Sequence, residues 1–252
     1  MKRLLCAFGV AALLPISAFA QSTPASPQRH LVYSFTWGLS NDTQVHTSGM
    51  DNEMSGGGIG GSSDSASGMA DFSGGTSDKG TITVDVVREQ TDTGLVVSVS
   101  EQGQETRKAP PATCVVYSDT TIVCDPNKVV HMEELTLLRF LGSHFVDPNQ
   151  LDAKGHWRVE RDGPISSVAD YTISKNAAGV MTIDEVRVVK ETGAHQRTTN
   201  INATVGYDAV KTLPTSISEF TIERSEQGEQ YNTVKSQTVL QLQSDSLAAA
   251  KN

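Results

Sequence analysis

The second half of the chain repeats one pattern, in which apolar and polar residues alternate over segments separated by short turn-forming stretches. The clearest segment places Ile201, Val205 and Tyr207 on one face of a strand and small or polar residues on the other. The segments with this pattern are residues 167–174, 180–190, 196–207, 217–224 and 231–242. Connections this short join antiparallel strands that lie side by side. The pattern therefore predicts a meander of long hairpins in this half of the chain.

In the first half of the chain fewer segments show this alternation of apolar and polar residues. Residues 31–37 alternate so that Tyr33, Phe35 and Trp37 share one face of a strand. Residues 81–86 and 95–99 lie on either side of a turn and predict a hairpin. An aromatic face of this kind either packs into a core or offers a surface to an apolar ligand or a carbohydrate.

Cys114 and Cys124 end two β-prone runs around a turn centred near Asp119. In such a hairpin the two cysteines lie opposite each other, close enough for a disulfide after a small adjustment. A redox or metal-binding pair is the alternative, but the spacing is neither Cys-x-x-Cys nor that of a zinc site. We therefore predict a structural disulfide.

A helix is expected directly after this hairpin, near residues 129–141. Asp125 and Asn127 are candidate N-caps, two glutamates lie near the positive end, and Gly142 follows where a C-terminal cap falls. Apolar residues cover more than one narrow stripe of the helix, so it should be buried. The predicted fold class is mainly β: an antiparallel meander that forms a strongly curved sheet or an unclosed barrel, with a β-sandwich as the alternative, and one buried helix near 129–141.

The N-terminus has the three parts of a secretory signal peptide. Lys2 and Arg3 precede an apolar run over residues 4–14, and the small residues Ala18 and Ala20 form a cleavage site before Gln21. We expect residues 1–20 to be a signal peptide, residues 21–30 a mobile leader, and the protein to be exported to the periplasm or the extracellular space. No later stretch has the roughly 20 apolar residues of a transmembrane segment.

Residues 48–80 are dense in glycine and serine and hold few large apolar residues, so we expect a disordered insert. Gly56, Gly58 and Gly61 match the spacing G-x-G-x-x-G, but no apolar strand precedes them and no helix follows, so the match does not indicate a phosphate site. The insert is expected to interrupt a single β-rich domain over residues 31–243, followed by a polar tail over residues 244–252.

The charge of the chain argues against polyanionic partners. Without residues 1–20 the chain has 18 basic and 29 acidic residues, a net charge of −11. Nucleic acids and anionic lipid headgroups select basic surfaces, so neither is expected to bind. The negative charge favours solubility or, as the alternative, a basic partner.

Local catalytic motifs are absent from the sequence. It has no G-x-S-x-G, S-x-x-K, H-E-x-x-H, Walker A or Cys-x-x-Cys motif. Oxygen and imidazole donors cluster in residues 144–156, but their order does not match an EF-hand, and Pro148 with Asn149 is ordinary turn chemistry. We expect no catalytic residue, no cofactor and no metal site, although catalytic residues dispersed in the sequence would leave no such trace.

Two functions from different classes are consistent with these features. The first is non-catalytic binding of an apolar ligand such as a lipid, which the helix and the sheet would enclose. In length, export signal and strand–helix–strand order the chain resembles the periplasmic lipoprotein carriers with an unclosed barrel; the resemblance is architectural and transfers no functional residue. The second is a structural or interaction module of the cell envelope or surface, and a hydrolase is a weaker third. The predicted ligand-binding residues are Tyr33, Phe35, Trp37, Leu138 and Trp157.

Overall fold

The computed structural model describes residues 28–45, 75–90, 94–105, 107–117, 121–142, 145–146, 151–177, 179–193, 196–227 and 230–246. The predicted signal peptide, most of the predicted leader, residues 48–74 of the predicted insert and the end of the tail lie outside these ranges.

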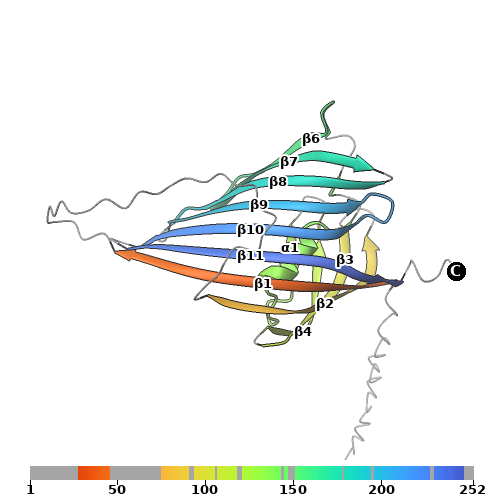
Figure 1. The fold of residues 1–252 in the computed structure, drawn as a ribbon, viewed down its shortest axis with the longest axis horizontal. Helices are drawn as coiled ribbons and strands as arrows, with labels where there is room; N and C mark the ends of the chain where they lie inside the picture. Colours follow the sequence, from red (N-terminus) through yellow and green to blue (C-terminus); the bar gives the residue numbers. More distant parts are fainter. Residues whose placement is uncertain are drawn as a thin grey trace, which may run out of the picture.

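Eleven strands and one helix make up the described residues (Figure 1). The strands of the first half are β1 (Arg29–Val45), β2 (Thr76–Gln90), β3 (Gly94–Gly103), β4 (Lys108–Val116) and β5 (Ile122–Cys124). The helix α1 (Met132–Arg139) follows. The strands of the second half are β6 (His156–Arg161), β7 (Ile165–Ala177), β8 (Val180–Glu191), β9 (Gln196–Asp208), β10 (Leu213–Gln227) and β11 (Gln230–Asp245).

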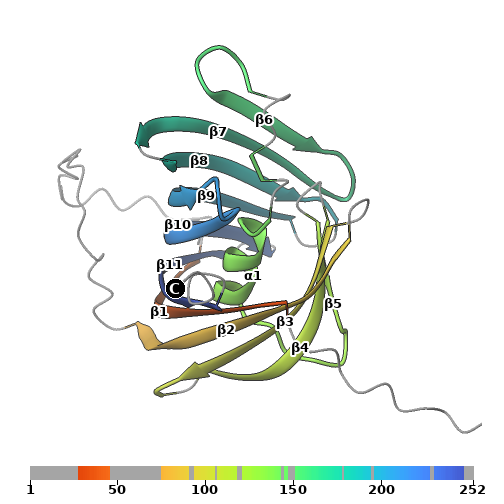
Figure 2. The same ribbon diagram turned by 90° about the vertical axis from the view of Figure 1, so that its right-hand side faces the viewer.

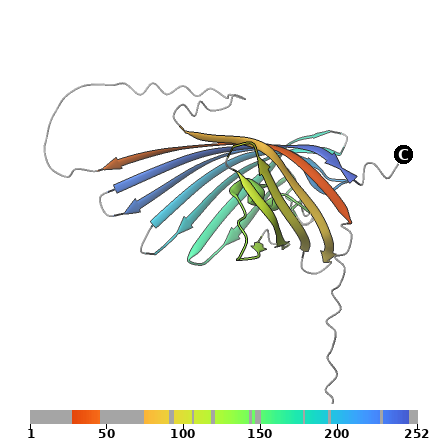
Figure 3. The same ribbon diagram turned by 90° about the horizontal axis from the view of Figure 1, so that it is seen from below.

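All eleven strands form one antiparallel sheet in the order β5-β4-β3-β2-β1-β11-β10-β9-β8-β7-β6. The sheet is open, because its edge strands β5 and β6 do not pair with each other. Figures 2 and 3 show that the sheet bends around α1, which lies on its concave side. The predicted mainly β fold with an antiparallel meander and one buried helix is confirmed, and the single sheet replaces the alternative of a sandwich.

The central pairing of the sheet joins the two ends of the domain. β1 pairs with β11 from Leu31↔Asp245 to Val45↔Gln230, and this contact connects the meander of the first half to that of the second. The pairing also extends the strands beyond the predicted boundaries. β1 begins at Arg29, within the predicted leader; β2 begins at Thr76, within the predicted insert; and β11 ends at Asp245, past residue 243.

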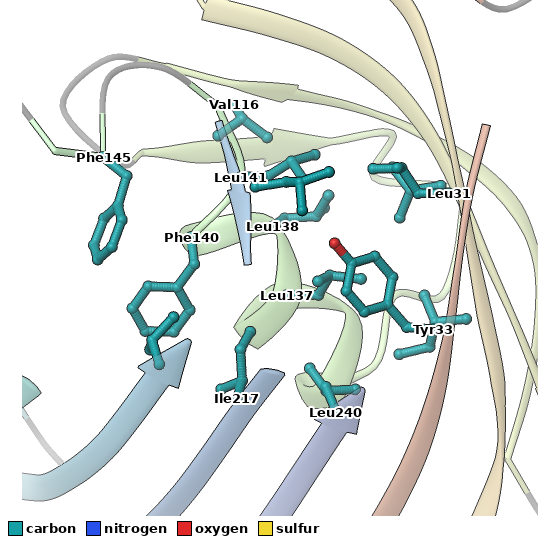
Figure 4. Packing of buried hydrophobic residues seen from close by; sticks show 14 of the residues in the cluster. Leu31, Tyr33, Val116, Leu137, Leu138, Phe140, Leu141, Phe145, Ile217 and Leu240 are labelled. Carbon is teal, nitrogen blue, oxygen red and sulfur yellow. The ribbon is translucent and has the colours of Figure 1, made fainter. Parts of the chain in front are cut away.

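The residues that alternate inward from these strands form one continuous core with the apolar side of α1 (Figure 4). Leu137 and Leu138 of the helix are fully buried and pack against the concave face of the sheet. The sheet contributes Leu31 and Tyr33 from β1, Ile217 from β10 and Leu240 from β11, as Figure 4 shows. Burial of this face is what holds so short a helix in place, because an isolated helix of this length is not stable in water.

The helix is shorter than predicted at both ends. It begins after the N-cap His131, whose backbone N–H donates to the Glu134 carboxylate, 2.7 Å away. The predicted cap Asp125 instead accepts from the backbone N–H of Asn127, 2.9 Å away, so residues 125–128 form a separate turn. At the other end Gly142 has φ 104°, the left-handed conformation that glycine adopts most readily after a helix.

The predicted antiparallel pairing of the two cysteine-containing strands is present, and the predicted turn at Asp119 lies outside the described residues. Cys114 of β4 lies opposite Cys124 of β5, and their sulfur atoms are 2.03 Å apart, at disulfide-bonding distance. β5 is an edge strand of three residues, so this link fastens the shortest strand to the rest of the sheet.

Candidate functional site

The predicted aromatic face of β1 lies inside the packed core. Tyr33, Phe35 and Trp37 are 0%, 2% and 7% exposed. The Tyr33 hydroxyl donates to the backbone oxygen of Pro214, 2.8 Å away, and the Arg107 guanidinium lies 3.8 Å from the centre of the Trp37 ring. These three residues therefore fill the core beneath the helix.

The other two predicted ligand-binding residues belong to the same core. Leu138 of α1 is fully buried, and Trp157 of β6 is 4% exposed. Trp157 stacks on Tyr171 with 4.8 Å between ring centroids, and Phe145 packs edge-on against both rings. Phe145 also contacts Phe140 at the end of α1, so an aromatic cluster connects the helix to the β6 edge of the sheet.

The concave face also holds charged side chains, and the first group of them fixes the C-terminal end of α1. The Arg139 guanidinium donates to Glu185 on β8 at 2.8 Å and to Glu219 on β10. Thr136, one helical turn earlier, donates its hydroxyl hydrogen to Glu219 at 2.9 Å. Burial alone would lower the pKa of Arg139, but the two carboxylates outweigh it and raise the pKa above its usual range.

This group continues toward β7. The Arg187 guanidinium donates to Glu185 at 2.8 Å and to the Tyr171 hydroxyl at 2.6 Å. Burial, followed by the nearby Glu185 charge, raises the pKa of Tyr171 to about 12. Glu185 thus accepts from two guanidinium groups, and we call Arg139, Arg187, Glu185 and Glu219 the C-terminal clamp of the helix.

A second charged group lies at the N-terminal end of α1. Glu133 and Glu134 are completely buried, and Glu101 of β3 is 3% exposed. The His131 Nδ1 atom lies 3.2 Å from Glu101, and the Arg107 Nε atom lies 3.1 Å from Glu133. One donor atom from each of Glu101, His131 and Glu133 falls within 4.8 Å of the others. We call Glu101, His131, Glu133, Glu134 and Arg107 the acidic cluster.

Burial dominates the protonation equilibria in the acidic cluster. It raises the pKa of Glu101 to about 9, with a further contribution from the neighbouring Glu133 carboxylate. Burial likewise raises the pKa of Glu134 to about 7, against the opposing effect of the hydrogen bond from the His131 backbone. The pKa of His131 is lowered, first by burial and then by the positive charge of Arg107.

Several polar atoms of the acidic cluster are buried without a hydrogen-bond partner. They are one oxygen each of Glu101 and Glu134, both oxygens of Glu133, and the Nε atom of Arg107. Glu133 still has its ion pair with Arg107, but the geometry of that contact is not that of a hydrogen bond. Buried polar atoms are normally paired, so this cluster is the most unusual place among the described residues.

Sequence reasoning missed both charged groups. Glu101 continues the inward face of Val97 and Val99, and Glu219 follows Ile217 on the inward face of β10. An acidic residue at a core-facing position of an alternating strand is the local signal that could have found them. That signal gives no indication of which residue lies opposite, because Glu101 and His131 are 30 positions apart.

The donor-rich segment 144–156 is described only in part. Asp152 accepts from the backbone N–H groups of Lys154 and His156 at 2.7 and 2.9 Å, so its carboxylate closes a turn. His156 lies 3.9 Å from Asp152 and 3.5 Å from Asp170, and all three side chains are more than a third exposed. His144, Asp147 and Asn149 lie outside the described residues.

A shallow hollow of about 410 Å³ lies on the outer face of β2, β3 and β4. Its lining includes Thr81, Thr83, Gln102 and Lys108, which alternate with core residues. None of the five predicted ligand-binding residues lines it, and Glu101, Ala109, Pro110 and Pro111 complete its lining beside the polar side chains.

Comparisons with known proteins found no matching family model, curated protein or solved structure. Within the described residues, no helix has both the length and the apolar character needed to cross a bilayer.

Proposed function

We propose that this protein binds an apolar ligand such as a lipid, without catalysis, on the concave face of its sheet. The observation that carries the proposal is that one helix of eight residues lies over this apolar face of an open sheet. Leu137, Leu138 and Phe140 fill the space that a lipid chain would occupy, and all three are fully buried. A ligand would therefore replace helix side chains by contacts of the same chemical type.

The polar contacts at the N-terminal end of the helix are incomplete, which favours its displacement. Its apolar side is matched to the sheet, but the polar contacts at its N-terminal end include buried carboxylate oxygens without hydrogen bonds. Such atoms regain water when the helix moves away, which offsets part of the cost of opening. In this proposal the helix acts as a plug, and its displacement would also break the contacts of Arg139 with Glu185 and Glu219.

Export is part of the proposal. The signal-like segment over residues 1–20 directs a chain across a membrane, and Cys114 and Cys124 at disulfide-bonding distance suit an oxidising compartment. The net negative charge of the chain disfavours binding of anionic headgroups. The part of a lipid that the protein recognises would therefore be the acyl chain.

Mass spectrometry of the exported protein, before and after solvent extraction, is the direct test. A stoichiometric apolar molecule that is present in the native protein and removed by the solvent is the expected result. Oleate serves as the probe in a second measurement, with Leu138→Ala as the test variant and Met132→Ala, 57% exposed on the same helix, as the matched control. Truncating Leu138 weakens the closed state, so oleate should bind that variant several-fold more tightly than the wild type.

Met132→Ala should bind oleate as the wild type does. An empty native protein, together with no saturable oleate binding by any of the three proteins, would contradict the proposal.

The filled core favours a second candidate, a structural or interaction module of the cell envelope or surface. All five predicted ligand-binding residues are at most 7% exposed, as in a core that serves only stability. This candidate predicts an empty protein in the same experiment and a helix that stays docked.

A further inference from the structure

We infer that Glu101, His131 and Glu133 form a binding site for one divalent transition-metal ion of the zinc class. One donor atom from each residue lies within 4.8 Å of the other two, and no other group of three among the residues that the structure describes meets this condition. Glu101 comes from β3, while His131 and Glu133 come from the first turn of α1. The inference does not require lipid binding; a metal ion bound here would oppose the displacement of α1 that lipid binding needs.

The buried oxygens of this group provide the second observation. Glu133 is completely buried and neither of its carboxylate oxygens accepts a hydrogen bond, and one oxygen of Glu101 is in the same state. Two buried carboxylates this close repel each other unless a proton or a cation lies between them. A metal ion bound by both would satisfy these oxygens and remove the repulsion.

The formal charge of the acidic cluster suits a divalent ion. Metal binding would displace the protons held by these buried carboxylates, and the fully ionised Glu101, Glu133 and Glu134 together with Arg107 would then have a net charge of −2. Among the described residues Arg107 forms the ion pair with Glu133, and its Nε atom is itself without a hydrogen bond. It can therefore turn toward Trp37, which it already covers at 3.8 Å, when a metal ion takes the carboxylate.

The donor set indicates the class of metal. One imidazole nitrogen with two carboxylate oxygens suits Zn²⁺ or Co²⁺ better than Ca²⁺ or Mg²⁺, which prefer oxygen alone. Donors around one tetrahedral zinc ion lie roughly 3.3 Å apart, given bond lengths of about 2.0 to 2.2 Å. The 3.2 Å between His131 Nδ1 and Glu101 Oε1 already fits, and the Glu133 carboxylate, within 4.8 Å of both, completes the set of three donors.

A metal ion here would fasten the start of the helix to the sheet. The C-terminal clamp already fixes the other end through Arg139 with Glu185 and Glu219. Metal binding would therefore complete the attachment of α1 at both ends.

The test is titration of chelator-treated wild-type protein with Zn²⁺ by calorimetry, combined with the visible spectrum of the Co²⁺-loaded protein. One Zn²⁺ per chain, a raised melting temperature and Co²⁺ bands of low-symmetry coordination are the expected results. Glu133→Gln and His131→Ala should each weaken Zn²⁺ binding by about tenfold or more and change the Co²⁺ spectrum.

Glu105→Gln and His156→Ala are the matched controls, because Glu105 is exposed near the same strand and His156 lies in the other cluster of donors. Both controls should bind Zn²⁺ as the wild type does. Glu133→Gln removes the repulsion from Glu101 but also the ion pair with Arg107, so circular dichroism of the metal-free variant is recorded to show that its loss of binding is not a loss of fold. Absence of Zn²⁺ binding by the wild type would overturn the inference in favour of a shared proton. Equal binding by Glu133→Gln, or loss of binding only in His156→Ala, would also overturn it.

Discussion

The Arg139 guanidinium on α1 lies 2.8 Å from the Glu185 carboxylate on β8, and both side chains are nearly or completely removed from solvent. Glu219 on β10 contacts the same guanidinium from a second strand. The helix is thus bound to the concave face by charge as well as by apolar packing. Buried ion pairs of this kind make removal of one partner far more costly than removal of the whole pair.

Replacing Arg139 with methionine should destabilise the fold by about 3 to 5 kcal/mol, because the buried Glu219 would lose this cation and Glu185 would keep only Arg187. The free energy of unfolding in urea measures this change. Arg158→Met is the control: Arg158 pairs with Glu160 on the surface, both side chains are more than half exposed, and a much smaller change is expected. Equal effects of the two substitutions would mean that the C-terminal clamp adds nothing beyond an ordinary surface pair.

Replacing Leu138 with alanine should cost about 2 to 5 kcal/mol, since Leu138 is fully buried between the helix and the sheet. Met132→Ala on the same helix removes a side chain that is 57% exposed, so its effect should stay below about 1 kcal/mol. Chemical denaturation of both variants measures the difference. A small effect of Leu138→Ala would show that α1 does not pack on the sheet as described.

Much of the fold follows from the period-two pattern of the sequence. The alternation in residues 196–207 predicts both the strand β9 and its buried face, which contains Val205 and Tyr207. The pairing of β1 with β11 could not be predicted in the same way. This pairing joins residues that are distant in the sequence, such as Leu31 and Asp245. A local pattern of apolar and polar residues does not indicate which distant strand lies next to β1.

The charged groups are the less predictable part of the candidate site. Glu133 and Glu134 resemble the acidic residues of any first helical turn, where they interact favourably with the helix dipole. Their burial arises only because the helix start docks against Glu101 on β3. The signal peptide and the five ligand-binding residues were predicted from local chemistry alone. Export of the protein and ligand binding by these residues both stay predictions.

Reduction of the bond between Cys114 and Cys124 should lower the free energy of unfolding by about 2 to 3 kcal/mol, from the entropy of a closed loop with a sequence separation of 10. Comparison of urea unfolding with and without reductant measures this change. The double variant Cys114→Ala with Cys124→Ala should not respond to reductant. Alkylation of both cysteines in the untreated protein would show that they are not bonded.

The buried tyrosines should make the protein sensitive to alkaline pH. Burial raises the pKa of Tyr171 to about 12, and it raises the pKa values of Tyr33 and Tyr207 further. An unfolded chain ionises its tyrosines near pH 10, so the stability gained by keeping them neutral is complete below pH 10. It is lost as the pH rises from 10 through 12, because the unfolded state then releases protons that the folded state retains.

The absorbance of tyrosinate, followed together with circular dichroism, checks this prediction. The phenolate signal of the buried tyrosines should rise only as the β signal disappears, in a single transition. Tyr171→Phe should be less stable by about 1 kcal/mol at neutral pH, because Arg187 loses the hydroxyl to which it donates at 2.6 Å. Above pH 10 the stability of the same variant should fall less steeply than that of the wild type, since one of the three buried tyrosines named above is gone. Ionisation of all tyrosines near pH 10 with an unchanged β signal would show that these hydroxyls are open to water and that the core around Tyr171 is not closed.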